Sequence, residues 1–193
     1  MELKNGLPII PFTSPGEWEG WLAENHASSR GLWVKIAKMG AGAASISYAQ
    51  TLEVALCYGW IDGQKGALDD RFWLQRFTPR GPRSKWSRIN RNEAEQLIEL
   101  GRMRPPGLAQ VERARADGRW EAAYESASGA TVPEDLQREL DRNPAASAFF
   151  AGLDRVNRYA FLYRLQDARR PETRAARLAR FVAMLSEGRT IHP

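Results

Sequence analysis

The chain has 193 residues, of which 28 are basic and 23 acidic, so its net charge is +5, and 43% of its residues are hydrophobic. This composition is that of a globular protein and excludes a disordered chain. A single cysteine, Cys57, excludes a disulfide framework, and the two histidines, His26 and His192, lie far apart in the sequence, so we expect no metal site and no cofactor.

The first 80 residues are predicted to form a small, mainly antiparallel sheet. Two prolines restrict the first candidate strand to a sheet edge, because proline donates no ladder hydrogen bond. The next shows an apolar residue at every second position, and the last two are joined by a short turn and predict a hairpin. The candidate strands are 7–12, 32–39, 60–65 and 71–78.

Helices are predicted between these strands and throughout the rest of the chain. Capping boxes at Ser14–Glu17 and Ser47–Gln50 begin the first two. After Pro82 the apolar period changes from 2 to 3.6, which is typical of helices. The remaining helices are expected to begin near residues 84, 105, 131, 143, 156 and 171. In the last helix, arginines at 174, 177 and 180 lie off the apolar stripe and are expected to face water.

These elements predict an α+β fold with a small sheet and two helices in the N-terminal half, followed by a helical C-terminal half. We expect an α+β domain over 1–118 and a helical extension over 131–193 packed on it, or one continuous domain. The segment between them has the composition of a linker.

Three motifs in the middle of the chain carry a resemblance. They are Ala55–Gly63 (ALCYGWIDG), Arg76–Arg80 (RFTPR) and Ser84–Ser87 (SKWS) followed by Asn90. With them, the chain resembles the bacteriocin-protection, YdeI/OmpD-associated family over about residues 15–190. The resemblance implies a small bacterial protein with a protective or stress-response role and no established chemistry.

Asp62 and two arginines suggest a site on the predicted hairpin. Arg76, Thr78 and Arg80 occupy alternate positions, so we expect them to share one sheet face, where they would suit a carboxylate or phosphate. Asp62 is either a ligand-facing acid or the ion-pair partner of these arginines. If the arginines hold a ligand, Arg80→Met should leave stability unchanged or raise it.

Three further residues complete this candidate site, which defines no reaction. Trp60 and Trp86 are expected to form its walls. Asn90 falls on an apolar helix face, where its amide either orients the ligand or bonds the backbone of the preceding loop.

The leading hypothesis is a cytoplasmic protective protein that binds a small anion between the hairpin 60–80 and the helix beginning near Trp86. One alternative is a nucleic-acid-binding protein that uses the basic strip, which we define as Arg80, Arg83, Lys85, Arg88 and Arg91. Another is a module that docks a protein partner on its helical half. No membrane partner is expected, because no stretch approaches the ~20 apolar residues of a membrane helix and the N-terminus lacks a secretion signal.

Overall fold

The structure is a computed structural model that describes residues 2–192. The chain divides into two compact units. The first, the sheet unit, runs from the N-terminus to Trp86 and again over Asn90–Ala122. The second, the helical unit, contains Ser87–Ile89 and the chain from Ala123 onward.

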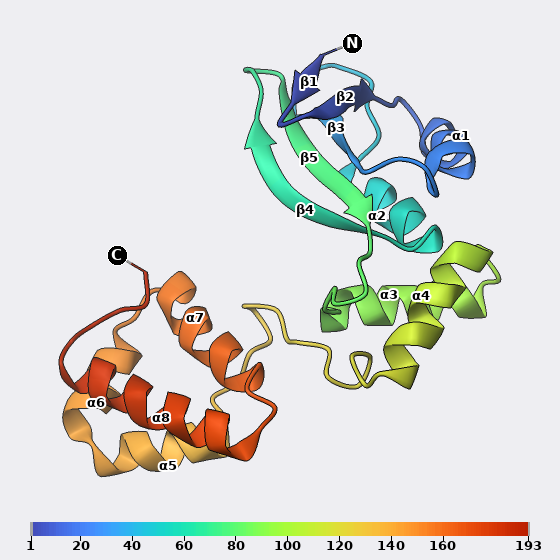
Figure 1. The fold of residues 1–193 in the computed structure, drawn as a ribbon. Coiled ribbons are helices and arrows are strands. Elements are labelled where there is room, and N and C mark those ends of the chain that lie inside the picture. The colour runs from blue at the N-terminus through green and yellow to red at the C-terminus, as the bar shows by residue number, and fades with distance from the viewer. Residues whose placement is uncertain (1, 193) are drawn as a thin grey trace. The chain divides into compact units, whose positions relative to one another are not determined.

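The sheet unit is built on five strands in the order β1-β2-β3-β5-β4 (Figure 1). Neighbouring strands are antiparallel except β2 and β3, which are parallel because the helix α1 connects them. The segment 7–12, predicted as an edge strand, forms β2, and the two-residue β1 pairs along its outer side. The strands are β1 (Leu3–Lys4), β2 (Leu7–Pro11), β3 (Leu32–Ala37), β4 (Trp60–Ala67) and β5 (Phe72–Pro79).

Eight helices occur within the described residues, and no strand follows β5 there, so the predicted α+β class is confirmed. None of these helices combines the length and the apolar character that crossing a membrane requires. They are α1 (Pro15–Asn25), α2 (Tyr48–Cys57), α3 (Arg88–Glu99), α4 (Pro105–Ala116), α5 (Glu134–Arg142), α6 (Pro144–Ala151), α7 (Arg155–Gln166) and α8 (Pro171–Ser186).

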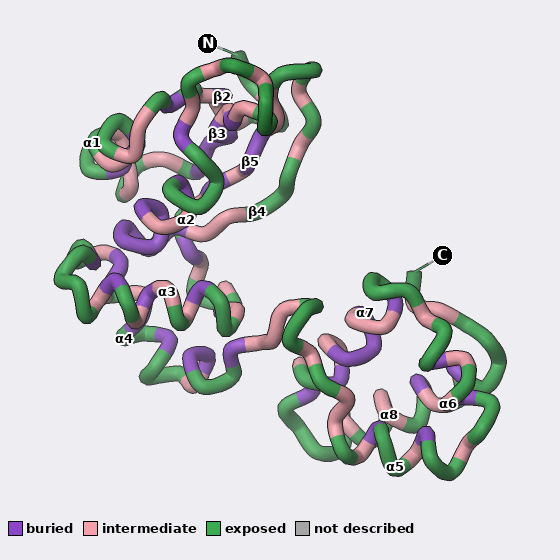
Figure 2. Tube along the Cα trace, turned by 180° about the vertical axis from the view of Figure 1, so that it is seen from behind, coloured by how far each residue is buried: buried purple, intermediate pink, exposed green. Residues whose placement is uncertain are grey.

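One face of the sheet packs against aromatic side chains of α1. Ser14 caps this helix, its hydroxyl accepting from the amide of Glu17 at 3.3 Å. Trp18 is fully buried, and its ring lies 5.9 Å from that of Phe77 on β5. The second half of α2, Val54–Cys57, is buried as well (Figure 2). This face therefore carries much of the core of the unit.

The other face of the sheet is partly covered by side chains of its own strands. Trp33 packs with Ile9 and Leu74 in a small apolar cluster. Its indole donates to the carbonyl of Lys4 at 3.0 Å, and the Lys4 ammonium donates to the carbonyl of Ala67 on β4 at 3.2 Å. The two edge strands are thus drawn together, which covers part of this face and shields edge groups that would otherwise be open to pairing.

Hydrogen bonds from two arginines of α8 to the end of α7 help to hold the helical unit together. Arg174 makes a bidentate pair with Asp135, at 2.6 and 2.8 Å, and also donates to the carbonyl of Leu165 at 2.7 Å. Arg177 donates to the carbonyl of Arg164 at 2.7 Å. The expectation that these α8 arginines face water is therefore wrong for Arg174 and Arg177. They lie off the apolar stripe, but they donate to carbonyls in the last turn of α7, where i+4 helical partners are lacking; the carbonyl of Leu165 also accepts from the amide of Ala168 at 3.1 Å.

The Asp135–Arg174 pair predicts an acid-sensitive contribution to stability. Its hydrogen bonds hold the pKa of Asp135 below the ordinary value of 3.8. A depressed carboxyl pKa stabilises the fold above the unfolded-state pKa, and this contribution disappears as the pH falls through the folded-state pKa. We expect Asp135→Asn to lower the urea midpoint at neutral pH and to flatten the loss of stability below about pH 4.

Circular dichroism at 222 nm follows this unfolding. Tryptophan fluorescence reports on the sheet unit, to which all seven tryptophans belong, and shows whether the loss of stability is confined to the helical unit. Asp141→Asn, at an exposed position of the same helix, is the matched control and should have little effect. A pH profile identical in wild type and Asp135→Asn would contradict the assignment.

Candidate functional site

The hairpin of β4 and β5 places Asp62 and Arg76 on opposite faces of the sheet. Asp62 lies directly across from Phe77, and side chains paired in this way point to the same face. Arg76 and Thr78 flank Phe77 along β5 and therefore point to the other face. Tyr48 of α2 donates to a carboxylate oxygen of Asp62 at 2.9 Å. Asp62 thus binds Tyr48 on the helix-covered side, and it neither faces nor neutralises Arg76.

A bulge in β4 contributes to this arrangement. Asp62 pairs with Phe77, but the next pair is Lys65 with Gln75, so β4 holds one extra residue. The buried side chain of Gln75 donates to the carbonyl of Gly63 at 2.8 Å and fixes the bulge. The sequence does not fix the hairpin register. Alternation of side chains along a strand assumes regular pairing and therefore cannot reveal a bulge.

Of the predicted anion-binding residues, Arg76 and Thr78 lie on the same sheet face, as expected. The Arg76 Nε lies 3.1 Å from the point where a Cβ on Gly63 would stand, so it passes closely over the bulge. This nitrogen is buried and has no hydrogen-bond partner within residues 2–192. A buried donor without a partner is uncommon in proteins. The carboxylate of Asp62 does not belong to this group.

Arg80 and Trp86 form a separate cluster that belongs to the fold. Arg80 lies beyond the end of β5 and is only 4% exposed. Its guanidinium carbon lies 3.6 Å from the ring centroid of Trp86, and it donates to the carbonyl of Lys85 at 3.2 Å. Trp86 in turn packs edge-on against Trp120, with centroids 4.8 Å apart. The strand end is thus fixed to the segment that leads into α3.

Trp60 and Asn90 are also buried. Trp60 is 1% exposed, contacts Trp18 and Trp21 edge-on, and donates to the carbonyl of His26 at 3.3 Å. Its ring therefore belongs to the aromatic core. Asn90 lies in the first turn of α3 and is 8% exposed. The seven predicted site residues are divided among the aromatic core, the two sheet faces, the Arg80–Trp86 cluster and the start of α3.

The basic strip has intramolecular partners along much of its length. Arg88 pairs with Glu125 at 2.5 Å. Arg91 donates to the carbonyl of Trp120 at 3.5 Å and lies 3.8 Å from Glu121. With Arg80 stacked on Trp86, the cations Arg80, Arg88 and Arg91 all have partners in the fold, and the strip gains no support as a phosphate-tracking surface.

Cys57 is a core residue, as the sequence predicts. It is 5% exposed at the end of α2, and burial raises the pKa of its thiol to about 11. A thiol with so high a pKa is neutral at physiological pH and a poor nucleophile.

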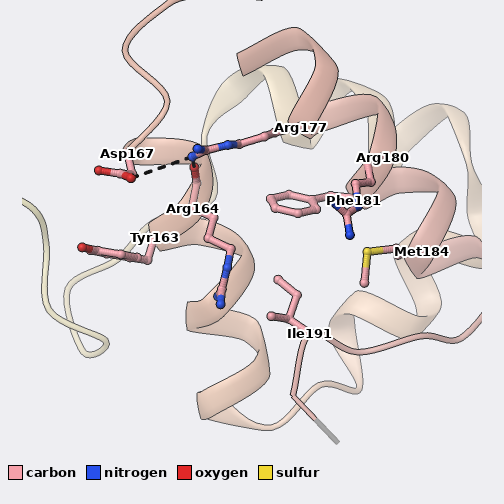
Figure 3. A pocket seen from close by; sticks show the side chains of 8 residues that line it. All are labelled: Tyr163, Arg164, Asp167, Arg177, Arg180, Phe181, Met184 and Ile191. Atoms are coloured by element: carbon pink, nitrogen blue, oxygen red, sulfur yellow. Dashed lines mark hydrogen bonds and ion pairs between the residues drawn. The ribbon is translucent and has the colours of Figure 1, made fainter. Parts of the chain in front are cut away.

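A cavity of about 530 Å³ lies in the helical unit, between α7, α8 and the C-terminal segment (Figure 3). Three arginines line it against one aspartate, so its charge is positive. Apolar side chains supply much of the remaining wall. The lining residues are Tyr163, Arg164, Asp167, Arg177, Arg180, Phe181, Met184 and Ile191.

The three arginines of this cavity are in different situations. Arg177 turns toward Asp167, 3.9 Å away, and binds the α7 carbonyl described above (Figure 3). Arg164 donates at 3.1 Å to the carbonyl of Ala160 in its own helix. No ion pair or hydrogen bond joins Arg180 to another residue within 2–192. Arg164 and Arg180 thus carry charge that no carboxylate of the described chain neutralises.

The sequence contained a signal for this cavity. Arg177, Arg180, Phe181 and Met184 have spacings of i, i+3, i+4 and i+7, which place them on one helix face. This stripe, half cationic and half apolar, includes Phe181, which also belongs to the core of the helical unit. Arg164 comes from another helix, and no local pattern predicts that it joins them.

Comparison with known protein families divides the chain in two. The family model described as "Domain of unknown function (DUF8412)" matches residues 10–110, which is more than half of the chain. The chain belongs to this family. A second family model, described as "Bacteriocin-protection, YdeI or OmpD-Associated", matches residues 129–188. No curated protein and no solved structure matches this DUF8412 member.

The second match confirms the resemblance to the bacteriocin-protection family and places it on the helical unit. The motifs that suggested it, at 55–63, 76–80 and 84–90, all lie in the part of the chain matched by the DUF8412 model. The cavity, by contrast, is lined almost wholly by residues of the bacteriocin-protection match.

The geometry predicts that Arg80 stabilises the sheet unit, contrary to the expectation from sequence. Arg80→Met removes a desolvated cation–π contact and a hydrogen bond, which together contribute about 2 kcal/mol. We expect a lower urea midpoint by tryptophan fluorescence. Arg83→Met, at an exposed position of the same loop, is the control and should leave the midpoint unchanged. Equal midpoints for Arg80→Met and wild type would return Arg80 to the list of ligand-binding residues.

Proposed function

We propose that this protein binds a small organic anion in the cavity of its helical unit, and that binding serves a protective role in the cytoplasm. The anion is a carboxylate or phosphate attached to an apolar body. The observation that carries the proposal is the pairing of two uncompensated guanidiniums, Arg164 and Arg180, with the apolar wall of Phe181, Met184 and Ile191.

The chemistry of the cavity supports this class of ligand. Guanidinium groups form charge-assisted hydrogen bonds with carboxylate and phosphate oxygens, and these are roughly twice as strong as neutral ones. Arg177 is already bound to the end of α7, so it supports the cavity rather than supplying free donors. Phe181 is 5% exposed and forms a rigid floor against which an apolar group can pack.

The protective role has its own support. The helical unit matches the family whose description names bacteriocin protection. The proposed ligand site therefore lies in the helical unit, which carries the family match, and not on the hairpin 60–80 that the sequence suggested.

A second candidate is an anion held by Arg76 and Thr78 on the sheet. The unpartnered, buried Nε of Arg76 favours it. This site would use the two predicted residues that share a face, without Asp62, Arg80 or the tryptophans.

Phenyl phosphate is a suitable probe, because it joins an anion to an apolar ring. We expect calorimetry to detect binding, and Arg164→Met or Arg180→Met to weaken it about tenfold or more, since a hydrogen bond to a charged group contributes about 1.5–3 kcal/mol. Arg169→Met makes the same charge change at an exposed position outside the cavity and should have no effect. Weakening by Arg76→Met alone would favour the sheet site, and equal weakening by Arg169→Met would show attraction to net charge only.

The protective role is tested in cells. Expression of the wild-type chain should raise survival of a sensitive bacterium under bacteriocin challenge, and the Arg164→Met, Arg180→Met double variant should lose this effect at equal protein level. Full protection by the double variant would show that protection does not depend on anion binding in the cavity.

A further inference from the structure

A second cavity, of about 370 Å³, lies beside the first in the helical unit. Two residues, Tyr163 and Arg164, line both cavities. The second differs in character because most of its wall is apolar or aromatic. Its other lining residues are Ala127, Arg155, Val156, Tyr159, Ala160 and His192.

The apolar wall comes from one stripe of α7. Val156, Tyr159, Ala160 and Tyr163 have spacings of i, i+3, i+4 and i+7, a pattern typical of a helix face that packs in a core. The core of the unit is instead formed by a different face of α7, which carries Phe161, Leu162 and Leu165. Ala160 is 5% exposed and Tyr163 packs edge-on against Tyr124, with ring centroids 5.2 Å apart, so the stripe is open chiefly at Val156, which is 65% exposed.

Tyr159 contributes its aromatic ring to this apolar wall, while its hydroxyl is bound elsewhere. The hydroxyl is occupied, since it donates to the carbonyl of Glu125 at 2.7 Å. Burial raises the pKa of this phenol to about 12, so it carries no charge at neutral pH. An apolar group can therefore pack against this wall without leaving the Tyr159 hydroxyl unpaired.

We propose that the second cavity receives the hydrocarbon tail of the anion whose head is held by Arg164 and Arg180, so that the ligand is an anionic amphiphile such as an alkyl phosphate or a fatty carboxylate. This inference rests on the proposed function, because Arg164 is the residue that joins head and tail sites. The positive charge of the first cavity selects the anionic head, and the apolar wall of the second cavity selects the tail.

A homologous series of alkyl phosphates tests the proposal, each member used below its critical micelle concentration and at constant ionic strength. Each added CH2 that enters the cavity should strengthen binding about fourfold, the equivalent of ~0.8 kcal/mol, until the cavity is full. Val156→Ser should reduce this increment. Arg180→Met, which changes a residue of the first cavity only, should weaken every member by a similar factor and leave the increment unchanged.

Leu100→Ser is the matched control, because Leu100 is 69% exposed and belongs to neither cavity. It should change neither the affinity nor the increment. Thermal unfolding of each variant without ligand verifies that the fold is intact.

The possible failures are distinguishable. Binding of short alkyl phosphates that depends on Arg164, with no gain from longer chains, would overturn the tail site and leave the proposed function standing. A gain per CH2 that Val156→Ser does not alter would place the tail elsewhere and also overturn this inference. Binding of no member through Arg164 would overturn the proposed function itself. Self-association that Val156→Ser abolishes in sedimentation would show that a second copy of the chain, and not a tail, covers the stripe.

Discussion

The geometry of the candidate site depends on the hydrogen bonds that α8 donates to the end of α7. The last carbonyls of a helix lack helical partners and carry partial negative charge, so they attract cationic donors. Arg174 and Arg177 supply them, reaching Leu165 and Arg164 at 2.7 Å each. Arg174 also binds Asp135, so the same side chain joins α5 to this corner. The core contact of Phe161 with Phe181, whose ring centroids lie 5.1 Å apart, also joins α7 to α8, and the hydrogen bonds from α8 fix the end of α7 beside the cavity.

Arginine thus has two distinct roles in this chain. Arg80 and Arg119 are buried and bind carbonyls or aromatic rings of the sheet unit, and Arg174 does the same in the helical unit. These guanidiniums are used by the fold. Arg164 and Arg180 differ from these because they line the cavity, where no carboxylate of the described chain pairs with either, and a positive charge left unpaired beside an apolar wall suits an external anion. The abundance of arginine is therefore not by itself a sign of a nucleic-acid surface.

Much of the fold could be predicted from the sequence. Capping residues fixed the starts of α1 and α2, and the change from period 2 to period 3.6 separated the sheet from the helical half. The shared face of Arg76 and Thr78 follows from alternation alone. The position of Asp62 does not, because it depends on hairpin register and on a bulge braced by Gln75, and neither leaves a mark in a local pattern.

The site was harder to predict than the fold for a related reason. Trp60, Trp86 and Asn90 are prominent in the sequence because they belong to motifs, yet each is buried in the sheet unit. The residues of the cavity belong to no short motif, since Arg164, Arg180 and Ile191 come from three separate segments. Periodicity can show that Arg180 and Phe181 share a face with Met184, but only the tertiary arrangement brings Arg164 to them.

The central claim is that the anion binds between α7 and α8 and not at the hairpin. Arginine Nε–H resonances, observed by NMR during a titration with phenyl phosphate, report on each guanidinium separately. The account predicts saturable shifts for Arg164 and Arg180, with Arg76 and Arg80 unchanged. Shifts centred on Arg76, with Arg164 and Arg180 unaffected, would contradict it.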